Sequence, residues 1–505
     1  RTNTSNKLTM AKSSVPDAQS SSGSDEEDAE QIRITLTPAS GIEETDLHWK
    51  LTGGVVPITV PADIRRRGLS VVVNHLLGRT AESDNSDDEE ETEEKLAPIP
   101  FDFLLNGRLL RMGLETVAKR DGLSLEEALE IVYFPAVSAP QGSGSSEEMP
   151  DWISCLVGVG GNGGTGGGSG VCTGGYDGSI RWMEKCVEMA SVVAHAGPIK
   201  CLAVDSTSNT IATGSIDQTL VTHTYNPQTR ELGLHAVYSG GHSNSIESVA
   251  LGASSDKTFL ASGDWMGGLC LWEVPRGDAA VETAPTKKAK TATNSTATAV
   301  REVQPKASWK AHASSISHLC YTHDSVSSST SSKLISSSWD HSLKVWDVER
   351  QDCILTLNGN RVVSAMDRCS NSDVVATGHP DCTMRLWDMR TQSGGGGEKE
   401  GSTGVSEKTF RPSHKSWISA LQWSPTDPFI LATNSHDGIL KLWDIRSSVP
   451  LHSTRAHEKG EKGLCLAFDA SGSNGGGGGD GDGETNKTHG IYTGGSDCVV
   501  KHYRF

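Results

Sequence analysis

Histidine and aspartate recur together along most of the chain, and these two residue types could perform acid–base chemistry. His195 precedes Asp217 by 22 positions, and His414 precedes Asp437 by 23. A buried histidine needs both ring nitrogens hydrogen-bonded, and an aspartate in a tight turn can accept one N–H group. Because the pairs recur once per unit, whereas an active site occurs once per chain, the pattern predicts a structural hydrogen-bond network and no enzyme. The residues expected in this network are His195, Asp217, His312, Asp340, Trp346, Asp381, Trp387, His414, Asp437, Trp443, His457 and Asp497.

The elements that must position these residues are β-hairpins. Within 338–347 the turn pair Asp340 and His341 leads into an alternating strand that ends at Trp346 and Asp347. Seven copies of this pattern, three strong and four weak, predict an array of similar units. The third unit has Met266 where aspartate is expected, and the fifth opens with 357–360 where histidine is expected, so we expect weaker networks there.

A second candidate is a carboxylate pair ahead of the repeats. Ser124 and Glu127 are three residues apart, which is the spacing of a capping box at the start of a helix. Glu127 would then fold back on the helix start, and Glu126 would point outward. On the residues alone, Glu126 is a solvated carboxylate at a helix start.

A third candidate is the basic cluster of Lys287, Lys288 and Lys290. Short basic clusters act as nuclear import signals, but they are also common on solvated loops. The residues alone leave both interpretations open.

Composition excludes several classes of function. The net charge of −18 disfavours a broad attraction to nucleic acid phosphate. The eleven cysteines contain no C-x-x-C pair, which is typical of core residues in a reducing compartment. No apolar run reaches the length of a membrane span. The Gly-rich stretch 158–170 lacks the Gly-Lys-Ser/Thr ending of a phosphate loop, and no zinc-ligand spacing occurs, so we expect no intrinsic metal or cofactor.

The pattern divides the chain into four parts. Residues 1–30 are Ser-rich and acidic and predict a disordered tail. Residues 31–136 predict a small α+β domain with the strand–strand–helix–strand order of a ubiquitin-like roll and an acidic insertion at 82–95. Residues 137–149 predict a flexible linker. Residues 150–505 hold the repeats, with insertions near 274–305, 393–408 and 471–488.

The His, Asp and Trp pattern resembles the WD-repeat β-propeller, whose blades are four-stranded sheets. The expected fold is therefore mainly β, a seven-bladed propeller preceded by a small ubiquitin-like domain. Phrases in 101–112, 129–133, 151–154 and 337–347, taken in this order, resemble the Ytm-type WD-repeat proteins of ribosome biogenesis. That family joins a Notchless-like domain to a propeller.

The resemblance implies a non-enzymatic assembly factor for the large ribosomal subunit and its rRNA maturation. Its implied partners are the Bop/Erb-type propeller protein, pescadillo, the midasin AAA ATPase and the pre-60S particle, with rRNA contact at most indirect and no membrane. A Glu at the position of Glu126, with Glu127 as the alternative, would complete the coordination of a divalent ion, Mg²⁺, in a site on midasin. The implied location is the nucleus, in the nucleolus and nucleoplasm.

Two other readings stay open. A Notchless-type protein of a later assembly step has the same architecture with eight blades, so a count of blades separates it. A substrate adaptor of a ubiquitin ligase would bind the degron of its substrate with its propeller and would co-purify with a ligase.

Overall fold

The computed structural model describes residues 31–39, 51, 57–79, 97–160, 170–205, 208–226, 229–253, 258–275, 301–322, 333–389, 408–411, 413–469 and 490–505. Contacts divide the chain into two compact units, with the boundary between Ala136 and Val137. The predicted tail 1–30, the acidic insertion 82–95, most of the three later insertions and the three lysines lie outside the described residues.

The first unit is a mixed five-stranded sheet with two helices. Its elements are β1 (Gln31–Pro38), β2 (Ile58–Pro61), α1 (Arg66–Leu76), β3 (Phe101–Leu105), β4 (Arg108–Leu109), α2 (Leu114–Arg120) and β5 (Leu129–Pro135). The strand order is β2-β1-β5-β3-β4, with β1 and β5 parallel, which is the ubiquitin-like arrangement that the sequence predicts.

Alternation of apolar residues explains this sheet. In β1, Ile32, Ile34 and Leu36 are buried, and they pack with Leu69 and Val73 of α1. Between β3 and β4, Asn106 and Gly107 both have positive φ, 50° and 72°, as a two-residue hairpin turn requires.

One local prediction in this unit is wrong. Ser124 does not begin a helix, because 121–128 is an irregular loop between α2 and β5. The Ser124 hydroxyl instead accepts the backbone N–H of Glu126 at 3.3 Å, so it closes a short turn. The helix of this region, α2, lies upstream, in residues for which no helix was predicted.

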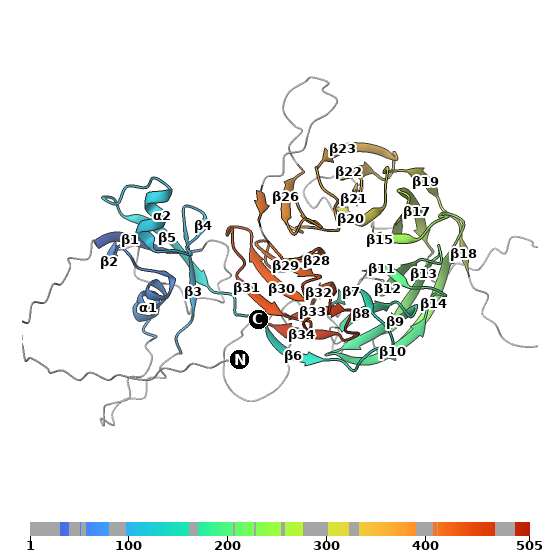
Figure 1. Cartoon of the computed structure of the whole chain (residues 1–505), viewed down its shortest axis with the longest axis horizontal. Helices are drawn as coiled ribbons and strands as arrows, with labels where there is room; N and C mark the ends of the chain where they lie inside the picture. The colour runs from blue at the N-terminus through green and yellow to red at the C-terminus, as the bar shows by residue number, and fades with distance from the viewer. Residues whose placement is uncertain are drawn as a thin grey trace, which may run out of the picture. The chain divides into compact units, whose positions relative to one another are not determined.

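The second unit consists of seven sheets arranged as the blades of a ring (Figure 1). The first three blades comprise β7 (Ile153–Val159), β8 (Gly170–Gly175), β9 (Ser179–Glu184) and β10 (Val187–Val193); β11 (Ile199–Asp205), β12 (Thr210–Ser215), β13 (Leu220–Asn226) and β14 (Glu231–Tyr238); and β15 (Ile246–Ala253), β16 (Thr258–Asp264), β17 (Gly268–Val274) and β19 (Ala307–Lys310). A short strand, β18 (Glu302–Val303), adds in parallel to β14, so the end of the expected insertion 274–305 is ordered as a strand.

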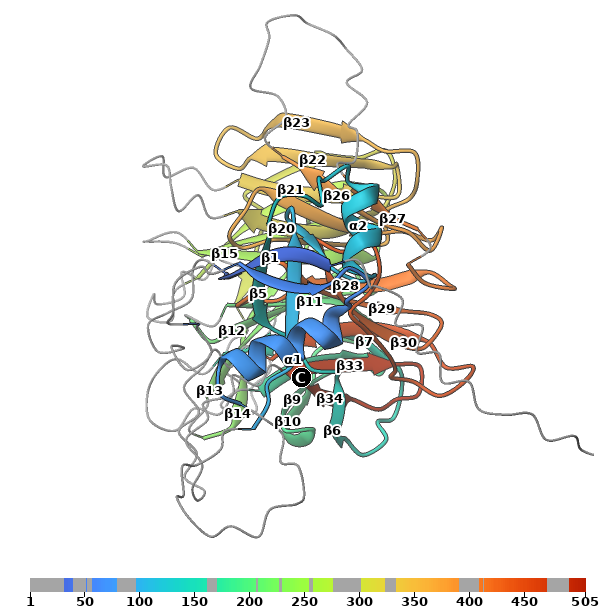
Figure 2. The same ribbon diagram turned by 90° about the vertical axis from the view of Figure 1, so that its left-hand side faces the viewer.

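The remaining blades continue the ring. They comprise β20 (Ile316–Thr322), β21 (Lys333–Ser338), β22 (Ser342–Asp347) and β23 (Asp352–Asn358); β24 (Ala365–Arg368), β25 (Val374–Gly378), β26 (Met384–Asp388) and β27 (Lys408–Phe410); β28 (Ile418–Trp423), β29 (Ile430–Ser435), β30 (Ile439–Asp444) and β31 (His452–Arg455); and β32 (Gly463–Phe468), β33 (Gly490–Gly495), β34 (Lys501–Arg504) and β6 (Gln141–Ser145). Figures 1 and 2 both show blade four running from β20 near the centre of the ring to β23 at its rim. The innermost strands contact their neighbours all the way round, and β32 returns to β7, so the described strands close a ring of seven blades, not eight.

The ring closes through a strand that comes from before the first blade. β6 pairs antiparallel with β34 and supplies the outermost strand of the last blade. The prediction of a flexible linker at 137–149 is therefore wrong. Its Gly- and Ser-rich composition hid the strand, because all five residues of β6 are exposed and their partner lies at the far end of the chain.

Each blade repeats one turn between its second and third strands. The residue after the aspartate position has positive φ in every blade, for example His341 at 73° and Gly438 at 70°. The eleven cysteines are all free thiols. Within the described ranges, no helix is long and apolar enough to cross a membrane.

Candidate functional site

Blade four holds the most complete of the His–Asp networks. Trp346 Nε1 lies 2.8 Å from Ser336 Oγ, Ser336 Oγ lies 2.7 Å from His312 Nε2, and His312 Nδ1 lies 3.0 Å from an Asp340 carboxylate oxygen. The carboxylate only accepts and the indole N–H only donates, so Nδ1 carries the imidazole proton and the serine donates to Nε2. Every hydrogen in the chain of four residues has an acceptor.

Blade six repeats this network with threonine in place of serine, and blade two repeats its histidine, threonine and aspartate but has His223 where blade four has tryptophan. His195 Nδ1 lies 3.1 Å from an Asp217 carboxylate oxygen, and His195 Nε2 lies 3.0 Å from Thr213 Oγ1. His414 Nδ1 lies 3.3 Å from an Asp437 carboxylate oxygen. In blade six, Thr433 contacts both His414, at 2.7 Å, and Trp443, at 2.9 Å. Burial lowers the pKa of His195 and His414, so both rings are neutral at neutral pH, as this donor pattern requires.

The third blade was predicted to have a weak network because of Met266, and this is wrong. Asp264, two positions earlier, accepts the backbone N–H groups of Met266 and Gly268 at 2.9 and 2.7 Å. It also lies 3.0 Å from His242, whose other nitrogen lies 2.7 Å from Ser262. The aspartate is displaced along the chain, but its carboxylate has the same partners.

Blade five has its network without a histidine before the blade. His379, at the end of β25, contacts Thr377 at 2.8 Å and donates to the Val362 carbonyl oxygen at 2.7 Å. Thr377 also accepts Trp387 Nε1 at 2.8 Å, while Asp381 pairs with Arg385 at 2.8 Å. A histidine from inside the blade thus restores the bonds to threonine and tryptophan. It bonds Val362 and not Asp381, so the prediction of a weaker network holds for the His–Asp link alone.

The first and last blades vary the pattern. In blade one, Asp177 pairs with Arg181 four residues later, as Asp381 does with Arg385. In blade seven, Asp497 contacts both His457, at 2.9 Å, and Lys501, at 2.8 Å.

These networks are buried, which fits a structural role and not catalysis. The His312 and His414 side chains are 0% exposed, so no substrate reaches their nitrogens. Among the described residues, no group of three His, Cys, Asp or Glu side chains could hold a metal ion.

Glu126 and Glu127 lie on the loop between α2 and β5, and both are exposed. Leu123 and Leu125 of the same loop pack against the core of the first unit, and Leu129 is buried at the start of β5. Leu123, Leu125 and Leu129 therefore hold this segment against the core. Glu126 and Glu127 lie between Leu125 and Leu129, and their carboxylates are exposed to solvent. Tyr133, on β5, is fully buried, and its hydroxyl accepts the Leu51 N–H at 3.0 Å.

A further cluster of side chains surrounds one end of the central channel of the propeller. In six blades the innermost strand has a register shift that leaves one residue unpaired, such as Ser154, Lys200 or Ser419. Ser364 of blade five lies at the equivalent place without a recorded shift. In blades one, four and six a second residue comes from the turn, immediately before the aspartate: Tyr176, Trp339 and His436.

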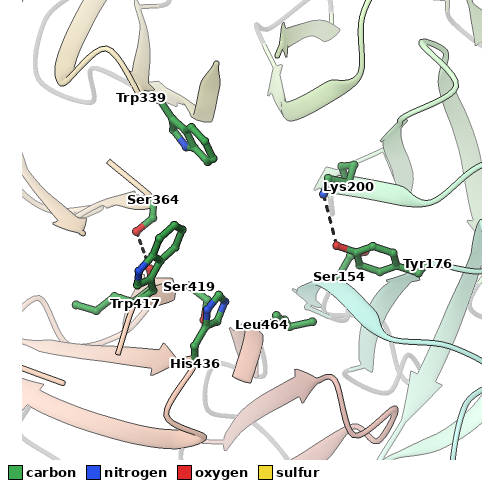
Figure 3. A pocket seen from close by; sticks show the side chains of 10 residues that line it. Ser154, Tyr176, Lys200, Trp339, Ser364, Trp417, Ser419, His436 and Leu464 are labelled. Carbon is green, nitrogen blue, oxygen red and sulfur yellow. Dashed lines mark hydrogen bonds between the residues drawn. The ribbon is translucent and has the colours of Figure 1, made fainter. Parts of the chain in front are cut away.

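Figure 3 shows these side chains around a shared hollow, which we call the channel mouth. Its lining residues are Ser154, Tyr176, Lys200, Trp339, Ser364, Trp417, Ile418, Ser419, His436 and Leu464. Blade six contributes four of them and blades one, two, four, five and seven contribute one or two each, so the members come from distant parts of the sequence.

Family models match both units. One described as NLE (NUC135) domain matches residues 51–118, and one described as WD domain, G-beta repeat, matches 186–221, 303–347, 351–388 and 404–444. A ribosome biogenesis protein WDR12 homolog from Chlamydomonas reinhardtii is 31% identical over 464 residues, which cover 88% of this chain and 93% of that protein. This chain belongs to the WDR12 family of WD-repeat ribosome biogenesis proteins.

Plant relatives of the same name agree. The Oryza sativa subsp. japonica protein is 28% identical with coverage of 88% of this chain and 93% of its own, and the Arabidopsis thaliana protein is 30% identical with coverage of 79% and 86%. The resemblance to a Ytm-type ribosome biogenesis protein is therefore confirmed, as is the propeller with its small N-terminal domain. WDR12-family chains are named for ribosome biogenesis, and none of the matched family names denotes an enzyme.

The WD-repeat matches fall on blades two, four, five and six. The three unmatched blades depart from the regular pattern through Asp177 without a preceding histidine, Met266, and Tyr503 in place of tryptophan. Two matched blades also depart from it, blade two through His223 in place of tryptophan and blade five through 357–360 in place of histidine.

Proposed function

We propose that this WDR12-family chain is a non-enzymatic assembly factor for the large ribosomal subunit that acts in the nucleolus and nucleoplasm. The propeller binds the Bop/Erb-type protein and pescadillo on the pre-ribosomal particle. The first unit docks on the midasin AAA ATPase, which pulls the protein off the particle at the expense of ATP.

The observation that carries this proposal is the exposed carboxylate pair on an anchored loop of the first unit. A divalent ion with an open coordination position binds a carboxylate oxygen strongly. Glu126 is exposed, while Leu123 and Leu125 of its loop are held in the core, so its carboxylate can be delivered with little loss of loop entropy. Glu126 is the proposed donor, and Glu127 is the alternative.

The short connection between the units supports transmission of a pulling force. The Ala136 N–H donates to the Pro100 carbonyl oxygen of the first unit at 2.8 Å. The next residue, Val137, offers its carbonyl oxygen to His452 of the propeller at 2.9 Å. Adjacent residues are thus each bonded within their own unit.

A pull-down with the isolated metal-ion-dependent adhesion domain of midasin tests the docking residue. In the presence of Mg²⁺, Glu126→Ala in the full chain should reduce binding by at least about a hundredfold, because a metal ligand is lost. Glu126→Asp should keep part of the binding, and Glu115→Ala, which removes a half-buried carboxylate of α2 paired with Lys119, should bind as the wild type does.

Glu127→Ala separates the two candidate donors. If Glu127→Ala abolishes binding and Glu126→Ala does not, the donor is Glu127. If both variants bind normally, or if chelation of Mg²⁺ has no effect on the wild type, metal-mediated docking is refuted.

A further inference from the structure

The seam of the ring, by which we mean the pairing of β6 with β34, is held by very little side-chain packing (Figure 1). All five residues of β6 are exposed, whereas the fourth strand of every other blade has buried or half-buried residues. Two residues of β6 are glycines, and the Ser143 hydroxyl lies 2.6 Å from His502 Nδ1. Backbone hydrogen bonds to β34 therefore provide most of the hold on β6.

The blades on both sides of the seam lack internal bonds that blade four has. In blade four the Ser336 hydroxyl links the histidine ring to the indole. Thr493 takes the place of Ser336 in blade seven, and Tyr503 takes that of the tryptophan. Within the described part of the chain, Thr493 Oγ1, His457 Nε2 and, in blade one, Thr173 Oγ1 are buried without a hydrogen-bond partner. Buried groups of this kind destabilise the blades that contain them.

Tension on the first unit reaches this seam along a single strand. Glu126 lies just before β5, and Ala136 and Val137 lead from β5 to the propeller. Because β5 is already extended, it can lengthen very little under load. A pull between Glu126 and the propeller is therefore carried by the backbone of β5, and no other strand of the first unit has to separate.

The seam is the next structure along this path. The load first meets the hydrogen bond between Val137 and His452, and then the pair of Gln141 with Arg504 at the beginning of β6. Because the load enters β6 at one end, its bonds to β34 are loaded in sequence and not together. The next firm hold is Met149, which is buried and whose N–H donates to the Cys498 carbonyl oxygen at 2.8 Å.

We propose that tension applied at Glu126 strips β6 from β34 and opens the propeller between blades seven and one. β6 precedes blade one in the chain and pairs within blade seven, so its removal takes away the strand that ties these blades together. An opened ring no longer offers its partners a rigid surface, which couples the pull to release. This inference rests on the proposed function, since it takes Glu126 as the point at which midasin pulls.

Stretching the full chain in optical tweezers tests the seam without midasin. One handle is attached to Cys353, which is the exposed one among the eleven cysteines, and the other to Ala128→Cys, an exposed position just before β5. The first opening event should release residues 137–145, a contour length of about 30 Å. It should occur at a lower force than any later event.

A disulfide clamp identifies the strand that opens. Gln141 and Arg504 are exposed and lie opposite each other at the loaded end of the seam, so Gln141→Cys with Arg504→Cys joins β6 to β34. The disulfide is formed before the handles are attached. The first event should disappear in the oxidised clamp and return on reduction. The matched control, Thr224→Cys with Gly233→Cys, joins an exposed pair on the rim of blade two and should leave the event unchanged.

Two results would overturn the proposal. One is a first event that survives in the oxidised clamp. The other is a first event that releases a whole blade, about 150 Å of chain, with no shorter event before it. The reduced clamp variant should open as the wild type does, which shows that the substitutions themselves have not altered the fold.

The stretching experiment contains neither midasin nor particles, so its result is independent of the proposed function. If β6 opens first but Glu126→Ala is released from particles as the wild type is, the proposed function fails and the seam remains the point at which the ring opens. If Glu126→Ala blocks release but the chain opens elsewhere under tension, only the inference about the seam fails.

Discussion

At the scale of single residues, histidine and aspartate have a structural role here because, in blades two, three, four and six, both ring nitrogens of the histidine have a partner inside the blade. In blade four, one serine oxygen joins the indole of Trp346 to the ring of His312. An unpaired buried polar group costs more than a paired one contributes, so the link residue should matter most.

Substitution of Ser336 by Ala tests this link. The variant leaves Trp346 Nε1 and His312 Nε2 unpaired inside the blade, and the free energy of unfolding should fall by about 2–3 kcal/mol. Ser453→Ala, which changes an exposed serine of the rim strand β31, should lower it by less than about 0.5 kcal/mol. Chemical denaturation of both variants makes the comparison, and equal stabilities would refute the role of the network.

The stability of the propeller should depend on pH through protonation of the aspartates in these networks. Burial alone would raise the pKa of Asp437, but hydrogen bonds from His414 and the Lys415 N–H outweigh it and lower the pKa to about 2. A lowered pKa means that the carboxylate stabilises the fold above its ordinary pKa of about 4, and that this contribution is lost as the pH falls towards 2.

Asp437→Asn should therefore be less stable than the wild type by about 1 kcal/mol at neutral pH, with the difference shrinking as the pH falls from about 4 towards 2. Asp352→Asn, on an exposed rim position, should differ little from the wild type throughout this range. Urea titrations at several pH values give these differences. A constant difference between Asp437→Asn and the wild type would contradict the assignment.

At the scale of elements, local patterns predicted the hairpins, and distant pairings escaped prediction. The turn and strand around Asp340 and Trp346 are contiguous in sequence, so period-two alternation reveals them. β6 has no apolar residue, and its only signal is a pairing with β34. The channel mouth escaped for a related reason, because its members come from separate blades and meet only when the ring closes.

Disruption of β6 should loosen the whole ring. Gly144 pairs with His502 of β34, and Gly144→Pro removes a backbone donor from this closing pair. The melting temperature of the propeller should fall by several degrees, for a loss of about 1–2 kcal/mol. Ser138→Pro, in the exposed coil before β6, is the control and should melt close to the wild type. If the two variants have the same melting temperature in calorimetry, β6 does not hold the ring closed.

At the scale of the whole molecule, the two units divide the work that we propose. The propeller provides a closed ring with a small aromatic mouth, and the first unit provides an anchored loop with exposed carboxylates. Adjacent residues at the boundary, Ala136 and Val137, are each bonded into a different unit. A pull on the first unit would therefore reach the propeller directly.

Release from purified pre-ribosomal particles is the most direct test of this account. Particles that carry either the wild-type chain or Glu126→Ala are incubated with midasin, Mg²⁺ and ATP, and the chain left on the particles is quantified after sedimentation. The account predicts that the wild type leaves the particles in an ATP-dependent manner while Glu126→Ala stays bound. Equal release of the two proteins, with Glu127→Ala also released normally, would contradict it.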